Sequence, residues 1–143
     1  MTLSLTPQKK VYNSYEAEIE KDQFNIISEP EVLYASAFND LIIVANYDKD
    51  YAAGLLDISY KTVSRYQKEK KKFSPLQSEY IIKSIVLFHK GEVVFGDADS
   101  FNSWLSKPAF GLGNKMPRNI ITTVTGINFV MDELNRIERG DLA

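Results

Sequence analysis

The chain has 143 residues, a formal net charge of −2 and an apolar fraction of 44%. This length allows one domain or two small modules that share a core, because modules of about sixty residues are marginally stable alone. The absence of cysteine excludes disulfides, thiolate metal sites and a cysteine nucleophile, and the slightly negative charge argues against a protein that binds nucleic acid over its whole surface.

Residues 1–30 show no regular apolar period. Lysines, tyrosines and an acidic run from Glu16 to Glu20 alternate there without forming a stripe. We interpret this segment as a loosely held N-terminal arm that ends at Pro30, with one short strand or helix over residues 15–21.

A helical pattern begins at Glu31. The apolar residues that can share one face of this first helix are Val32, Leu33, Phe38, Leu41 and Ile42. A break at residues 46–48 separates it from a short second helix over residues 50–56.

A tight turn at residues 57–59 leads into a third helix over about residues 60–69, with Ser59 as its N-cap. Two short helices joined by a tight turn, the second with basic and hydroxyl residues, are typical of a helix-turn-helix module. Asp57 stands where glycine is common, and aspartate tolerates the left-handed conformation better than most residues. We place this module at residues 31–91.

The clearest helix start in the sequence is Ser74-Pro-Leu-Gln77, where serine can cap, proline fits the first position and glutamine can close a capping box. We expect this helix to run to about Lys90, to end at Gly91 and to join the two modules. Residues 92–96 either extend it or form a short extended segment. Its predicted apolar face consists of Leu76, Tyr80, Ile81, Ile85 and Phe88.

The last third of the chain predicts three more helices. Asp97 or Asp99 can cap one that contains Phe101, Trp104 and Leu105 and that ends before Pro108. Trp104 fits core packing better than a partner interface because it shares a helical face with its apolar neighbours. A loop over residues 112–117 precedes a short helix that begins at Pro117. A final helix over residues 126–139 has one apolar stripe, made of Ile127, Val130, Met131, Leu134 and Ile137.

A basic cluster follows the predicted turn. The candidate DNA-binding residues are Tyr60, Lys61, Thr62, Ser64, Arg65, Lys68, Lys70 and Lys71. The first residues of a recognition helix reach base edges, while later lysines meet phosphates. Alternatively, the lysines only make a helix end soluble and interact with its dipole. Because one such module binds weakly, we expect a homodimer that reads two half-sites of operator DNA.

An ordered set of residues in the second half of the chain is difficult to obtain by chance. It consists of Phe95-Gly96, Trp104-Leu105, Leu112-Gly113, Pro117, Thr123, Gly126, Leu134, Arg136-Ile137 and Gly140. This set resembles the toxin-binding domain shared by the Xre/MbcA/ParS-type antitoxins of bacterial toxin–antitoxin pairs. Ile58 to Tyr66 and Phe73 to Glu79 look like the DNA-facing module and connecting helix of the Xre type, so that the resemblance covers roughly Tyr51 to the C-terminus.

The resemblance implies an all-α fold in which a helix-turn-helix module and a small C-terminal toxin-binding module, residues 92–143, share a central helix. It implies an antitoxin that blocks a cognate RES-type, NAD-consuming toxin at its substrate entrance and represses its own operon. The candidate partner-binding residues are Asn114, Lys115, Arg118, Asn128, Asp132, Arg136 and Arg139.

Three positions in one turn depart from the family pattern. Asn114 replaces a glycine, Met116 replaces a capping serine or threonine, and Arg118 replaces an apolar residue. These departures concern partner specificity more than family membership. The polar positions of the last helix are either solvated or partner-facing.

The residue inventory argues against an enzyme. His89 is the only histidine, so a multi-histidine metal site is excluded. Acid pairs such as Asp97 with Asp99 and Asp132 with Glu133 are common on surfaces, and Gly111-Leu-Gly113 lacks the strand and length of a nucleotide-binding loop. We therefore expect no catalytic residue, cofactor or metal.

The sequence also predicts a cytoplasmic protein without a membrane partner. No signal peptide is visible, and the longest apolar runs are too short to span a bilayer. The alternative function is a helix-turn-helix transcriptional regulator in which the C-terminal module only dimerises and no toxin is bound.

Overall fold

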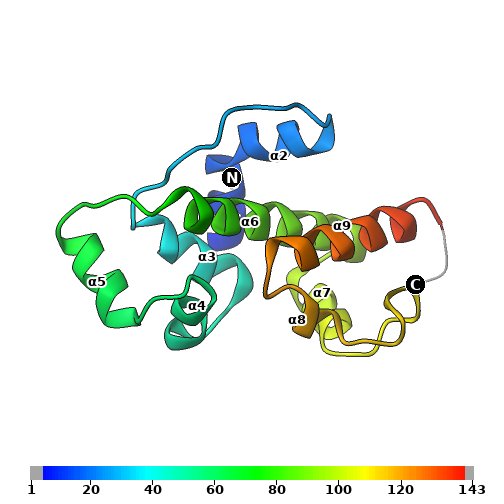
Figure 1. Ribbon diagram of the computed structural model, residues 1–143. Helices are drawn as coiled ribbons and strands as arrows, with labels where there is room; N and C mark the ends of the chain where they lie inside the picture. Colours follow the sequence, from blue (N-terminus) through cyan, green and yellow to red (C-terminus); the bar gives the residue numbers. More distant parts are fainter. Residues whose placement is uncertain (1–4, 141–143) are drawn as a thin grey trace. The chain divides into compact units, whose positions relative to one another are not determined.

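The computed structural model describes residues 5–140. Every secondary-structure element assigned within this range is a helix (Figure 1), so that the predicted all-α fold is confirmed. The α-helices are α1 (Pro7–Ser14), α2 (Glu16–Gln23), α3 (Ala37–Ala45), α4 (Lys49–Leu55), α5 (Tyr60–Lys68), α6 (Pro75–Phe95), α7 (Ala98–Leu105), α8 (Pro117–Ile120) and α9 (Val124–Glu138). A 3₁₀-helix, η1 (Phe110–Leu112), precedes α8. The chain divides into two compact units between Val86 and Leu87, inside α6.

The N-terminal segment is not the loosely held arm predicted from the sequence. Thr6 caps α1 by accepting a hydrogen bond from the backbone of Lys9, and α1 contacts α3. Val11 and Tyr15 are buried, and the Tyr15 hydroxyl donates to Asp40 Oδ2 at 2.8 Å. Sequence periodicity missed this packing because each of the two helices has only eight residues, which is too short to establish a stripe.

The helix that the sequence predicts from Glu31 begins later than expected, because α3 starts at Ala37. The backbone N–H of Leu33 donates to Ser78 Oγ at 2.9 Å, and its carbonyl accepts from the N–H of Phe73 at 2.8 Å. These long-range hydrogen bonds hold the chain extended before α3, and they leave Val32 exposed. Phe38 and Leu41 do lie on the buried face of the helix, as predicted.

The bounds of α4 and α5 agree with those predicted from the sequence for the second and third helices to within about one residue. Asp57 has a φ of 60°, the left-handed conformation expected at the turn. Ser59 caps α5 by accepting from the N–H of Thr62 at 3.1 Å. Val63, from the middle of α5, is fully buried in the first unit.

The capping box at the start of α6 is confirmed, since Ser74 and Gln77 each accept a hydrogen bond from the other's backbone N–H. Leu76, however, is 80% exposed, so that the predicted apolar face begins one turn later. The predicted stop at Gly91 is wrong, and the predicted alternative, in which the following residues extend the helix, is confirmed as far as Phe95. Gly91 is buried inside α6, where a β-carbon would overlap the ring of Phe101. The helix ends at Gly96, whose φ of 95° suits a residue without a side chain.

The second unit has an aromatic and aliphatic core. Phe101 is fully buried and makes an edge-to-face contact with Phe88, with 5.3 Å between the ring centroids. Trp104 is half-buried, and its ring centroid lies 5.3 Å from that of Phe95, which agrees with the predicted packing role. The buried residues of α9 are Gly126, Ile127, Val130, Glu133 and Leu134, so that the predicted stripe is largely confirmed, with Met131 and Ile137 half-buried at its edge.

Candidate functional site

The candidate DNA-binding surface is the exposed face of α5. Lys61, Arg65 and Lys68 are all exposed and recur at spacings of four and three, so that they share one face of the helix. The buried Val63 lies on the other side. Three of the predicted DNA-binding residues therefore form one solvent-facing basic stripe. This geometry suits contact with the phosphate backbone of a nucleic acid.

The α5 helix is fixed in its unit by two glutamines. Gln67 donates from its side chain to the carbonyl of Ala35 at 3.2 Å and to Asn39 Oδ1 at 3.2 Å. Gln77 donates to the carbonyl of Leu56, in the turn before α5, at 3.1 Å. The basic stripe of Lys61, Arg65 and Lys68 is thus presented by a helix that is hydrogen-bonded to the rest of its unit.

The other predicted residues at the start of α5 have structural contacts. The hydroxyls of Thr62 and Ser59 lie 3.0 Å apart and share a hydrogen bond. Tyr60 is half-buried, and its ring centroid is 5.9 Å from that of Phe38. Ser64 is half-buried as well. These residues are therefore less available for base contacts than Lys61 and Arg65.

Aromatic rings position several of the basic side chains. Arg65 and Lys71 lie over the ring of Tyr66, at 5.6 and 5.4 Å from its centroid. Lys71 also pairs with Glu69 at 3.0 Å, while Lys70 adopts a left-handed φ of 55° directly after the helix. Exposed cation–π contacts of this kind contribute about 0.5–1 kcal/mol, enough to orient a side chain without removing its charge.

The second candidate surface lies in the unit that follows Val86. Asn114 and Lys115 are exposed in the loop between η1 and α8. Asn114 has a left-handed φ of 60°, a conformation that glycine, the usual residue at this position in the family, adopts easily. Arg118 is half-buried and donates to Asn102 Oδ1 at 3.3 Å and to Ser106 Oγ at 3.4 Å. This arginine therefore connects α8 with α7.

The predicted residues on α9 divide into two groups. Asn128, Asp132 and Arg139 have exposed side chains. Arg136 is also exposed, but its Nη2 atom pairs with Glu133 Oε1 at 2.8 Å and donates to the carbonyl of Gly111 at 3.2 Å. Its guanidinium therefore links α9 to η1.

Sequence reasoning missed the two most exposed aromatic residues of this unit. Phe110, in η1, is 76% exposed, and Phe129, on α9, is 61% exposed. The sequence does contain a signal for Phe129, because this large apolar side chain falls outside the predicted stripe that contains Ile127 and Val130. Phe110 has no such periodic context.

Glu133 was also missed, except as a member of an acid pair. It is only 1% exposed, and its Oε2 atom has no hydrogen-bond partner. A β-carbon on Gly111 would overlap its carboxylate, so that η1 and α9 meet at these two residues. The neighbouring Asp132 is exposed, which means that the two acids do not form a facing pair.

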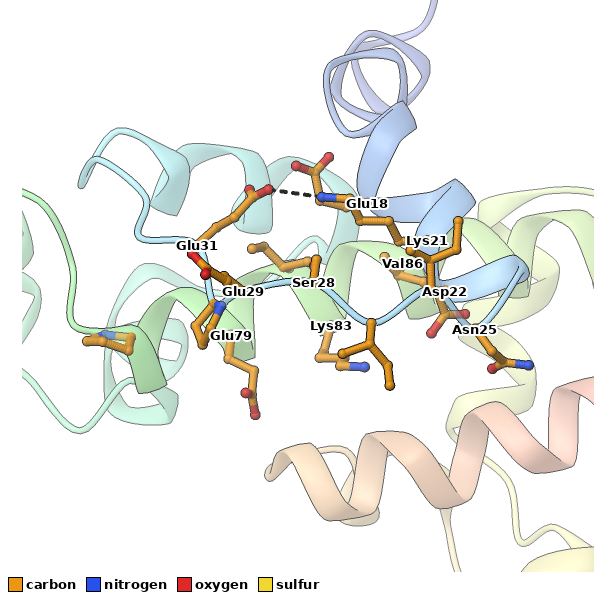
Figure 2. Close-up of a pocket in the computed structure, with 15 residues that line it drawn as sticks. Glu18, Lys21, Asp22, Asn25, Ser28, Glu29, Glu31, Glu79, Lys83 and Val86 are labelled. Carbon is orange, nitrogen blue, oxygen red and sulfur yellow. Dashed lines mark hydrogen bonds and ion pairs between the residues drawn. The ribbon is translucent and has the colours of Figure 1, made fainter.

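A cavity of about 360 Å³ lies in the first unit between α2, the segment after it and the start of α6 (Figure 2). Its wall contains an ion pair between Lys21 and Glu31 at 3.3 Å, and partial burial raises the pKa of Glu18 above its usual range. The remaining lining is both acidic and apolar, including Asp22, Ile27, Glu29, Glu79 and Val86. None of the predicted site residues lies here.

The residues weighed as catalytic candidates have other contacts. Asp97 caps α7 by accepting from the N–H of Ser100 at 2.7 Å. Burial lowers the pKa of His89, assisted by Lys90 and opposed by Glu92. Within residues 5–140, no group of histidine, aspartate or glutamate side chains could hold a metal ion, and no helix in that range has the length and apolar character needed to cross a membrane.

Comparison with known proteins confirms the resemblance predicted from the sequence. Residues 90–140 match the family described as the antitoxin Xre/MbcA/ParS C-terminal toxin-binding domain. A protein of Photorhabdus laumondii named antitoxin Xre is 32% identical over 84 residues, which are 58% of this chain and 57% of that protein. A protein of Yersinia enterocolitica with the same name is 30% identical over 84 residues, which are again 58% of this chain and 57% of that protein. The match thus spans little more than half the length of these relatives.

Proposed function

We propose that this chain binds and neutralises a cognate toxin, because residues 90–140 match the family described as the antitoxin Xre/MbcA/ParS C-terminal toxin-binding domain. The family match is the observation that carries the proposal. The relatives named antitoxin Xre support it, since they match a segment of 84 residues and not the short C-terminal domain alone.

The toxin-binding surface is proposed to lie on the second unit, which contains all of the predicted partner residues. Asn114, Lys115, Asn128, Asp132 and Arg139 are exposed there and available to a partner. Arg118 and Arg136 have contacts within the unit, so that their first role is to fix α8 and η1. The resemblance to Xre-type antitoxins makes a RES-type, NAD-consuming enzyme the first toxin to test.

Autorepression through DNA is the second part of the proposal. The stripe of Lys61, Arg65 and Lys68 on α5 favours contact with operator DNA, and the left-handed φ of Asp57 in the turn before α5 supports the predicted helix-turn-helix. We propose that a homodimer presents two such helices to two half-sites. Operator binding would then be electrostatic in large part and would weaken with salt.

Co-expression tests the antitoxin function. The product of the adjacent reading frame is expected to arrest growth alone and to be harmless when the full chain is co-produced. A chain truncated after Lys90 is expected to lose this protection, while one with Lys61, Arg65 and Lys68 all replaced by alanine is expected to keep it. If no neighbouring product is toxic, or if the truncated chain still protects, the proposed function is wrong.

The alternative is a transcriptional regulator whose C-terminal unit only dimerises. The basic stripe on α5 is the observation that favours it, because the stripe needs no toxin to act. Removal of the second unit would then convert a dimer into a monomer, without any effect on growth in the presence of the neighbouring gene product. The size of the truncated chain in solution therefore separates the two functions.

A further inference from the structure

Two phenylalanines of the second unit are exposed although the unit has a complete core without them. Phe110 and Phe129 are 76% and 61% exposed, whereas Phe101 is fully buried. Burial of a large aromatic side chain in a partner would remove apolar surface from water and so favour binding. Both residues lie within the segment that matches the toxin-binding family, so that they are candidates for an interface.

The two phenylalanines flank the contact between η1 and α9. Phe110 directly precedes Gly111, which lies against the carboxylate of Glu133. Phe129 is four residues before Glu133, and residues four apart are neighbours on one face of a helix. One phenylalanine is therefore displayed from each of the two elements that meet at Gly111 and Glu133.

The contact between these elements is tightly specified. The carbonyl of Gly111 accepts from Arg136, and Arg136 pairs with Glu133, so that one guanidinium joins both elements. Any side chain at position 111 would overlap the Glu133 carboxylate. Gly111 therefore allows η1 to approach α9 closely, and Phe110 lies directly before this contact.

The Glu133 carboxylate is kept at an energetic cost. Its Oε2 atom is buried without a hydrogen-bond partner, which opposes folding. An apolar residue at this stripe position would avoid that cost, but it could not pair with Arg136 and so could not fix η1. The Glu133 carboxylate therefore stabilises the position of η1, which contains Phe110, at the expense of its own solvation.

We propose that Phe110 and Phe129 are the hot-spot residues of the toxin interface, and that Glu133 is a positioning residue that holds Phe110 in place. This inference rests on the proposed antitoxin function. The proposal requires an apolar recess on the toxin that receives the two phenylalanine rings. Charged groups of opposite sign to the exposed Asp132 and Arg139 are expected around that recess. Aromatic side chains at the centre of an interface, surrounded by polar residues, dominate binding energies in general.

The aromatic hot spot is tested with the full chain and the purified toxin. Phe110→Ala and Phe129→Ala are each expected to weaken toxin affinity by about 30-fold or more, and the double variant is expected to abolish protection in co-expression. Leu76→Ala is the control, because Leu76 is equally exposed but lies outside the matched segment. Each variant removes an exposed side chain, so that unchanged thermal unfolding verifies the fold.

The outcomes separate the inference from the function it rests on. If the wild-type chain binds the toxin and the double variant binds it equally well, the hot-spot assignment is overturned while the antitoxin function stands. If the double variant keeps full toxin affinity but loses self-association, the aromatic surface joins two copies of the chain, which also overturns it. If the wild-type chain does not bind the toxin at all, both proposals are wrong.

The positioning role of Glu133 is tested with a double-mutant cycle. Gly111→Ala and Glu133→Gln are expected to reduce toxin affinity at least fivefold. Phe110→Ala is then expected to cost much less affinity in the Gly111→Ala background than in the wild type, because Phe110 is already misplaced. A purely structural role of the contact would change stability but leave the two effects additive, and that result would overturn the assignment.

Discussion

The ring of Phe101, in α7, occupies the space that a β-carbon on Gly91 of α6 would need. This contact allows α7 to approach α6 closely and explains why a helix of 21 residues tolerates a glycine in its interior. It also reverses the usual effect of replacing a helical glycine by alanine.

Gly91→Ala is expected to destabilise the protein. Alanine stabilises a helix interior by about 1 kcal/mol relative to glycine, but overlap with a fully buried ring costs about 1–3 kcal/mol. Gly54→Ala in α4 is the matched control, because nothing lies within 4 Å of its β-carbon position. Chemical denaturation should give a lower free energy of unfolding for the first variant and an equal or higher one for the second. Stabilisation by both would contradict the described packing of α7 on α6.

Tyr15→Phe is expected to lower the free energy of unfolding by about 1.5–3 kcal/mol, because it removes a hydrogen bond to a half-buried carboxylate. The bond lowers the pKa of Asp40, which burial raises, so that the variant should raise this pKa further. Tyr34→Phe is the control, since Tyr34 is exposed and its ring contact with Lys72 remains. Equal stabilities of the two variants would show that α1 is not fixed to α3 by this bond.

The stability of the protein is expected to fall as the pH decreases through the range in which His89 titrates. Burial lowers the pKa of His89 below its ordinary value of 6.5 in the folded protein. The unfolded chain therefore binds this proton more readily, and the contribution of His89 is present above pH 6.5 and is lost as the pH falls toward the folded pKa.

An NMR titration measures this directly, because His89 is the only histidine and its imidazole signals are unambiguous. A midpoint below 6.5 is expected, and His89→Gln should remove this part of the pH dependence of unfolding. A midpoint at or above 6.5 would be incompatible with the described burial of the imidazole.

Arg65→Ala is expected to weaken operator binding and to relax specificity at one base position, by about 1–3 kcal/mol of discrimination. Lys68→Ala is expected to weaken binding to all sequences. It should also reduce the slope of log affinity against log salt concentration by about one. Gel-shift titrations at several salt concentrations distinguish the two effects, with Lys9→Ala in α1 as an exposed basic control. Unchanged affinity of the Arg65 variant would argue against α5 as the recognition helix.

The sequence by itself determined the features that arise within one or two turns of chain. The left-handed turn at Asp57, the N-cap at Ser59 and the capping box of Ser74 with Gln77 all follow from residues less than five positions apart. The apolar stripe of α9 and the family resemblance are likewise patterns along the chain. Local backbone chemistry is the same in any tertiary context, so that these predictions hold.

Only the tertiary structure decided which side chains face outward and which are already engaged. The delayed start of α3 depends on Ser78, 45 positions away from its partner Leu33, and the passage of α6 through Gly91 depends on Phe101. Arg136 was predicted to contact a partner, but it links Glu133 to η1. The exposure of Phe110 likewise appears only in the folded chain. Contacts between distant elements have no period along the chain, because they depend on which surfaces meet when the helices pack.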